Sequence, residues 1–230
     1  MLQGLSIKRE AFARTVRLVS TARLRESVLR CLVDNEAELD ALYEIEGATS
    51  TRLVAQDRGF ESVSSKEFVY GVSHAKFINA AFAYAKPREL NRFNGPSRGA
   101  WYAALETETC LREVVFHMTE FLAMAGDFNA VVDYVEMFAS LAGEYVDLRD
   151  PPGSGHQCLH LDPKVAYLIG NALADAARAQ GHNGIIYPSV RHPGGTCIVA
   201  LWPHAIQSVA PGAVIRVSWI GARVPKIEQL

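Results

Sequence analysis

The chain has 230 residues, 49% of them hydrophobic and 21% charged, and its 23 basic and 25 acidic residues give a formal net charge of −2. These fractions are typical of a globular domain and exclude collagen-like, coiled-coil and disordered proteins. No stretch approaches the roughly 18 apolar residues of a membrane span, and the chain lacks the basic excess that drives duplex binding. We expect a globular protein with no membrane contact and no direct nucleic-acid binding.

Cysteine usage predicts a reducing, cytoplasmic setting. The cysteines are widely and irregularly spaced, with no CxxC pair, at Cys31, Cys110, Cys158 and Cys197. This pattern is typical neither of a zinc site nor of a disulfide-rich secreted domain. Charged residues at 8–10 interrupt the start, so no secretory h-region is expected there.

Two helices are predicted near the N-terminus. Over 22–33, apolar residues recur at the spacing of one helix face. Asn35 and Glu38 have the spacing of a capping box, and Gly47 stands where a helix C-cap is expected. We expect a helical N-terminal part over about residues 1–50 and loops around short elements over 48–91.

The remaining chain mixes strands and helices. The pattern predicts strands at 98–105, 129–137, 183–189, 197–202 and 214–220, a helix at 106–126 and a loop at 147–160. Asp162 is a favoured N-cap and Pro163 a favoured first helical residue, so a further helix is predicted to Ala179, closed by Gly181. Regular βαβ alternation, linkers and repeats are all missing. The sequence therefore predicts an α+β fold in a single domain, 1–230.

The chain carries none of the familiar nucleotide-binding or hydrolase motifs. The patterns GxGxxG, GxxxxGK[ST], GxSxG and HExxH are absent from the sequence. Ligand-type residues gather at His156, Cys158, His160 and Asp162, in a loop rich in proline and glycine. A metal centre needs about four organised ligands, and no distant partner pair accompanies this cluster. We expect no metal, and a metallo-hydrolase is the weakest alternative for the function.

Four dispersed residues carry the specific signal. Arg92 precedes Tyr102 by ten residues, Tyr102 precedes Glu113 by eleven, and Ser189 lies in the YPS element of the segment 181–195. In this order and spacing, over nearly the whole chain, the sequence resembles the longer branch of the RES-domain family, the toxin components of a class of bacterial toxin–antitoxin systems. It departs from the family pattern at Asn91, where a glycine or serine is usual.

The resemblance implies a fold, an activity and a partner. The implied fold is like that of ADP-ribosyltransferases, with a mixed or split β-sheet core and flanking helices. NAD+ is the implied substrate, and toxicity arises by consuming NAD+ or by transferring ADP-ribose to a protein of the host. The implied partner is an antitoxin with an Xre-like DNA-binding region.

The chemistry of the four residues suits cleavage of NAD+. Nicotinamide already carries positive charge in NAD+, so it leaves the ribose without the general acid that ordinary glycosides need. A guanidinium at Arg92 matches the pyrophosphate, and Tyr102 can stack on the nicotinamide ring. Glu113 can stabilise the cationic transition state and orient or deprotonate an acceptor. Ser189 would hydrogen-bond the nicotinamide ribose.

Further residues and functions remain open at this point. Arg17 matches another family arginine and either reaches the phosphates or forms a structural salt bridge. Arg191 and His192 either brace their loop or touch substrate. We expect Glu113 on the helix face opposite Val114, turned toward a cleft. A mono-ADP-ribosyltransferase is the first interpretation. The alternatives are an NAD+ hydrolase or phosphorylase, and a non-catalytic module that binds a nucleotide or partner.

Overall fold

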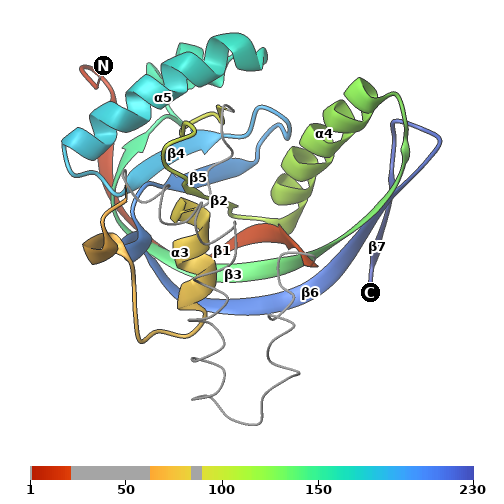
Figure 1. The fold of residues 1–230 in the computed structure, drawn as a ribbon. Helices are drawn as coiled ribbons and strands as arrows, with labels where there is room; N and C mark the ends of the chain where they lie inside the picture. The colour runs from red at the N-terminus through yellow and green to blue at the C-terminus, as the bar shows by residue number, and fades with distance from the viewer. Residues whose placement is uncertain (1, 22–62, 84–89) are drawn as a thin grey trace.

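One mixed sheet of seven strands organises the computed structural model, which describes residues 2–21, 63–83 and 90–230 (Figure 1). In the sheet the order is β1-β2-β5-β4-β3-β6-β7. The strands are β1 (Ser6–Ser20), β2 (Trp101–Ala104), β3 (Asn129–Asp147), β4 (Gly184–Pro188), β5 (Thr196–Ala200), β6 (Ile206–Ile220) and β7 (Lys226–Gln229).

The first strand closes part of this sheet into a ring. Val16 of β1 pairs with Ala104 of β2 and with Phe138 of β3. Strands β1, β2, β5, β4 and β3 therefore follow one another around a closed circuit, and β6 and β7 continue outward from β3. The pairing of β3 with β4 is parallel, and the other pairings are antiparallel.

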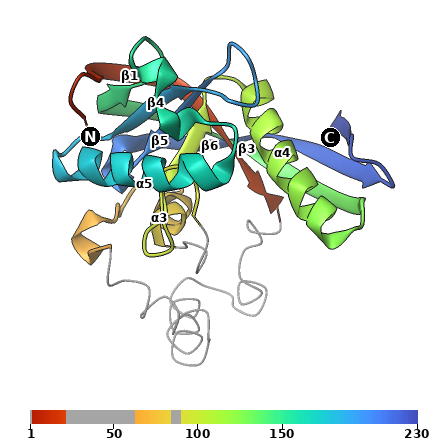
Figure 2. The same ribbon diagram turned by 90° about the horizontal axis from the view of Figure 1, so that it is seen from above.

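Within the described ranges, three α-helices cover the two faces of the sheet (Figures 1 and 2). They are α3 (Ala75–Ala83), α4 (Thr107–Ala125) and α5 (Pro163–Ala179). Apolar side chains of α4 and α5 pack into a core on one face, and those of α3 pack into a core on the other. Short 3-10 helices lie at Ser65–Glu67, Gly153–Gly155, Gln157–Leu159 and Pro203–Ala205. None of the helices in the described ranges is long and apolar enough to span a bilayer.

Alternation along the central strands explains why both faces are buried. On β4, Ile185 and Tyr187 join the core beneath α4 and α5, whereas Ile186 joins the core beneath α3. Successive side chains of a strand point to opposite faces, so a continuous apolar run fills both cores at once. The short run GIIYP thus forms the middle of a covered sheet.

Several predicted elements are confirmed. The α+β class is correct, and α4 lies within one residue of the predicted bounds at each end. Helix α5 begins at Pro163 as predicted, and the carboxylate of Asp162 accepts a hydrogen bond from the Lys164 backbone N–H at 2.9 Å. That bond satisfies one of the unpaired donors at the start of a helix, so the N-cap residue sets where α5 begins.

The N-terminal prediction is wrong over its described part. A helical part was expected over about residues 1–50, but Ser6–Ser20 form the long strand β1. The predicted helices at 22–33 and 35–47 lie outside the described residues. Within the expected loops of 48–91 the structure has the helix α3. Strand β3 continues ten residues beyond the predicted end at Met137 because its second half pairs with β1.

Candidate functional site

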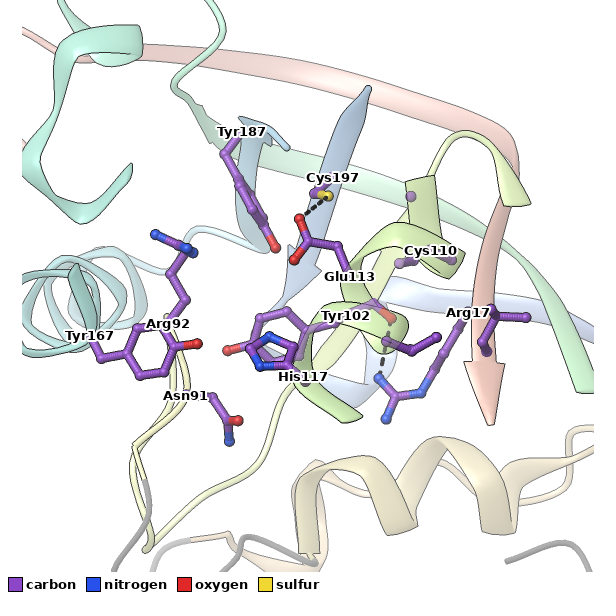
Figure 3. Close-up of a pocket in the computed structure, with 14 residues that line it drawn as sticks. Arg17, Asn91, Arg92, Tyr102, Cys110, Glu113, His117, Tyr167, Tyr187 and Cys197 are labelled. Carbon is purple, nitrogen blue, oxygen red and sulfur yellow. Dashed lines mark hydrogen bonds between the residues drawn. The ribbon is translucent and has the colours of Figure 1, made fainter. Parts of the chain in front are cut away.

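A cleft of about 230 Å³ lies between α4 and α5, over strands β1, β2, β4 and β5 (Figure 3). Helices α4 and α5 stand apart on the same face of the sheet, and residues of β1, β2, β4 and β5 line the cleft between them. The lining residues are Arg17, Leu18, Asn91, Arg92, Tyr102, Ala103, Ala104, Cys110, Glu113, Val114, His117, Tyr167, Tyr187 and Cys197. Four of the five predicted site residues are in this set, and Ser189 lies next to it.

Helix α4 supplies the carboxylate of the cleft. Cys110, Glu113, Val114 and His117 all line the cleft, and their spacing is that of one helix face. Glu113 faces a cleft as expected, but the expectation that it lies opposite Val114 is wrong. This face of α4 has apolar side chains at Cys110 and Val114 and polar side chains at Glu113 and His117. Exposure along it increases from the buried Cys110 to the exposed His117.

Ser189 holds the Glu113 carboxylate in place. Its hydroxyl donates to Glu113 Oε1 at 2.7 Å and accepts the backbone N–H groups of Arg191 and His192 at 3.2 and 3.0 Å. Ser189 is 8% exposed. Its hydroxyl is therefore fully engaged by protein groups and is directed at Glu113. This differs from the expectation that it points toward a ribose.

The loop after Ser189 is packed against the start of α4. Thr109 Oγ1 and His192 Nδ1 form a hydrogen bond of 2.9 Å, and Thr109 is fully buried. A Cβ at Gly195 would lie 2.6 Å from Thr109 Oγ1 and 2.9 Å from His192 Nδ1, so the close approach requires glycine. His192 thus braces the loop, which was one of the two expectations for it.

Arg92 lies at one end of the cleft and is held by backbone carbonyls. Its Nη1 donates to the carbonyl oxygens of Cys158 and His160, and the side chain is 8% exposed. The guanidinium carbon lies 5.6 Å from the ring centre of Tyr167. Arg92 is therefore a buried cation whose position is set by the loop that precedes α5.

Tyr102 connects β2 to the segment that carries Arg92. Its hydroxyl accepts the Phe93 backbone N–H and donates to Asn94 Oδ1, both at 2.9 Å. Burial raises the pKa of Tyr102 well above its ordinary value, so the hydroxyl stays protonated at neutral pH. The ring lines the cleft while the hydroxyl fixes the segment from residue 92 to 94.

Arg17 lines the cleft from β1, on the other side from Arg92 (Figure 3). Its Nη1 donates to the Tyr102 carbonyl at 3.2 Å, and its guanidinium carbon lies 4.9 Å from the ring centre of Trp101. The side chain is half-buried. Two arginines thus flank a cleft in which Glu113 lies between them.

Two tyrosines of the cleft were not singled out from the sequence. Tyr187 is 5% exposed, stands two residues before Ser189, and packs edge-on against Phe93 with ring centres 4.9 Å apart. Its place in the YPS element is a signal that could have found it. Tyr167 comes from the middle of α5, where helical periodicity gives no functional signal.

The histidine-rich loop does not assemble a metal centre within the described residues. His156 Nδ1 accepts the Cys158 backbone N–H, and His160 Nδ1 accepts that of Asp162. Cys158 is fully buried, and burial raises the pKa of its thiol to about 12. Over the described ranges no three His, Cys, Asp or Glu side chains gather in a way that could hold a metal ion.

Comparison with known proteins gives a family match and a distant structural likeness. The family model of the RES domain matches residues 68–220. The crystal structure of the M. tuberculosis MbcT–MbcA toxin–antitoxin complex contains a similar chain, with 18% sequence identity and a TM-score of 0.35. The alignment covers 53% of this chain and 71% of that chain. The search of curated proteins gave no match.

Proposed function

Because the chain belongs to the RES domain family, we propose that it is a toxin that consumes NAD+ by cleaving the bond between nicotinamide and ribose. The matched residues, 68–220, include every cleft-lining residue except Arg17 and Leu18. The proposal therefore concerns the cleft between α4 and α5 as the catalytic site.

A single carboxylate in the cleft is the observation that carries the proposal. Among the described residues that line it, Glu113 is the one acidic side chain. Hydrolysis of an ordinary glycoside uses two carboxyl groups, one of which protonates the leaving group. Nicotinamide leaves NAD+ as a neutral molecule without protonation. One carboxylate, placed to stabilise the positive charge that develops on the ribose, is then sufficient.

We assign the other residues to binding and positioning. Arg92 and Arg17 provide positive charge on the two sides of Glu113 for the dinucleotide phosphates. The ring of Tyr102 provides a flat wall against which nicotinamide stacks. We assign Ser189 as a positioning residue, because its hydroxyl is hydrogen-bonded to the Glu113 carboxylate and to backbone N–H groups of its own loop.

Release of nicotinamide from NAD+ by the purified protein, with and without cell lysate, tests this function. Glu113→Gln keeps the size of the side chain but removes its charge, and we expect turnover to fall by at least a hundredfold, on the order of the loss of one electrostatic stabiliser. The matched control is Glu108→Gln, an exposed position on the same helix. Full activity in Glu113→Gln, or NAD+ that stays bound and intact with wild-type protein, would refute the proposal. The second result favours a binding module.

We further propose that the ADP-ribose is transferred to a protein of the host. Glu113 can orient or deprotonate an acceptor, and His117, exposed one turn further along α4, extends the polar side of the cleft. Incubation of lysate with NAD+ labelled in its adenine half, followed by mass spectrometry, should find proteins with added ADP-ribose. Free ADP-ribose as the sole product would make water the acceptor. A phosphorylated ADP-ribose product formed in phosphate buffer would make phosphate the acceptor.

The family also leads us to propose an antitoxin partner with an Xre-like DNA-binding region. Co-expression with the product of a neighbouring small reading frame should restore growth of cells that make this protein. The antitoxin should co-purify with the wild-type protein and with Glu113→Gln. Growth inhibition that no neighbouring product relieves would contradict this part of the proposal.

A further inference from the structure

Two arginines from distant parts of the chain donate to the same stretch of backbone. The carbonyl oxygens of Cys158 and His160 accept from Nη1 of Arg92, and the next carbonyl, that of Leu161, accepts from Nη2 of Arg191 at 3.0 Å. Consecutive carbonyls lie a few ångströms apart in any backbone. The loop before α5 therefore holds both guanidinium groups, near enough that the charge of Arg92 lowers the pKa of Arg191.

Neither charge is neutralised by the part of the chain that the structure describes. Residues 2–21, 63–83 and 90–230 place no carboxylate within ion-pairing distance of Arg92 or Arg191. Arg191 is half-buried, its guanidinium carbon lies 3.5 Å from the ring centre of Phe116, and its Nε is buried without a hydrogen-bond partner. A buried, unsatisfied donor next to a second cation is costly for a protein with no anion present.

The loop that carries Arg191 is anchored to α4 through Ser189. Arg191 follows Ser189, whose hydroxyl accepts the backbone N–H of Arg191 and donates to Glu113. Burial lowers the pKa of Arg191, and the charge of Arg92 lowers it further, whereas Glu113 opposes that change. The repulsion between the arginines is thus built into the anchored loop.

We propose that Arg92 and Arg191 together form a subsite for a phosphate group, which in NAD+ is part of the pyrophosphate. This inference rests on the proposed function and adds Arg191 to the substrate-binding residues. A guanidinium carries five N–H donors, and the backbone carbonyls occupy Nη1 of Arg92 and Nη2 of Arg191. Nη2 of Arg92 and Nη1 of Arg191 are then left to donate to phosphate oxygens. Tyr167 also lines the cleft, with its ring centre 5.6 Å from the guanidinium carbon of Arg92, and adds a hydroxyl to the cleft lining.

Binding of inorganic pyrophosphate, measured by titration calorimetry, tests the subsite without any turnover. Arg191→Gln should weaken binding about tenfold to a hundredfold, as expected for the loss of charge-assisted hydrogen bonds. Arg191→Lys keeps the charge but loses the fork, and its affinity should lie between the two. Arg112→Gln, an exposed change on α4 that pairs with Glu108, removes the same charge outside the cleft and should leave the affinity unchanged. Equal affinity in wild type and Arg191→Gln, or no binding of pyrophosphate by wild type, would overturn the inference.

Substrate truncation separates a binding role of Arg191 from a structural one. Nicotinamide riboside has the scissile bond but no pyrophosphate. Arg191→Gln should therefore raise the KM for NAD+ about tenfold or more and leave the KM and kcat for nicotinamide riboside within about twofold. Equal losses with both substrates would mean that Arg191 acts only by bracing its loop, and would overturn the proposal. If wild type binds pyrophosphate but releases no nicotinamide from either substrate, the proposed function fails while the anion subsite stands.

Discussion

Gly170 allows α5 to approach the backbone of Arg92 closely. It lies in the buried middle of α5, where an added Cβ would lie 3.1 Å from the carbonyl carbon of Arg92 and closer still to its oxygen. Ordinary contacts between such atoms begin at about 3.5 Å. Gly170→Ala must therefore push α5 and the segment at Arg92 apart by roughly 1 Å. Overpacking of this kind costs typically 1–3 kcal/mol of unfolding free energy.

Helix propensity alone predicts the opposite change in the stability of Gly170→Ala. Alanine inside a helix is otherwise favoured over glycine by about 1 kcal/mol. Urea denaturation should show that Gly170→Ala is less stable than wild type, and nicotinamide release should fall up to about a hundredfold, because displacements near 1 Å disturb a catalytic geometry. Gly155→Ala is the control, since no atom lies within 4 Å of the position of its added Cβ. A Gly170→Ala protein with unchanged or raised stability would refute the reasoning.

Two further perturbations test the contacts that organise the sheet and the carboxylate. Ser189→Ala should lower nicotinamide release about tenfold or more by removing the donor to Glu113, whereas Ser140→Ala, on β3, should not; equal rates for both variants would contradict the positioning role. Asp147 is 1% exposed, and although burial alone would raise its pKa, hydrogen bonds from Arg149 and Lys8 outweigh burial and hold the pKa below its ordinary value. The pKa of an unfolded aspartate is about 3.9. The ionised Asp147 therefore stabilises the folded state above that pH, and this contribution is lost as the pH falls below it. Asp147→Asn should lower the free energy of unfolding at pH 7 by about 3 kcal/mol and flatten the loss of stability in acid, measured by urea denaturation; a parallel pH profile would contradict this.

Local signals made part of the fold predictable. Helix α5 has an N-cap at Asp162 and a proline at its first position, and both act within one turn of the helix start. The β4 and β5 runs are short and apolar, which is typical of strands covered on both faces. Such elements depend little on distant partners, and their predicted bounds are close to the observed ones.

Elements that depend on distant pairing could not be found in this way. The ladder of β1 with β3 shifts register between Phe12 and Thr15, so the alternation that identifies a strand is interrupted. Strand β3 passes through Gly143, which weakens the strand pattern, and it continues there because Gly143 pairs with Glu10. In both places tertiary pairing outweighs local sequence preference.

The candidate site was predicted as a set of residues but not as a geometry. The spacing of Arg92, Tyr102 and Glu113 identified side chains that line one cleft. The Ser189 hydroxyl donates to Glu113 because of the way the end of β4 meets α4. No spacing along the chain specifies that contact. The same holds for Tyr167, whose place in the cleft follows from the packing of α5.

The closed circuit of strands has a consequence for when the cleft can exist. Val16 meets Ala104 only after 88 further residues have been added, and the last cleft residue, Cys197, belongs to β5. Pairings this distant along the chain give a high contact order and slow folding. A ribosome adds about 5–20 residues per second. Cys197 follows Arg17 by 180 residues, so roughly 10 to 40 s of synthesis separate the first cleft residue from the last. The proposed site is complete only after Cys197 has been added and β5 has paired with β2.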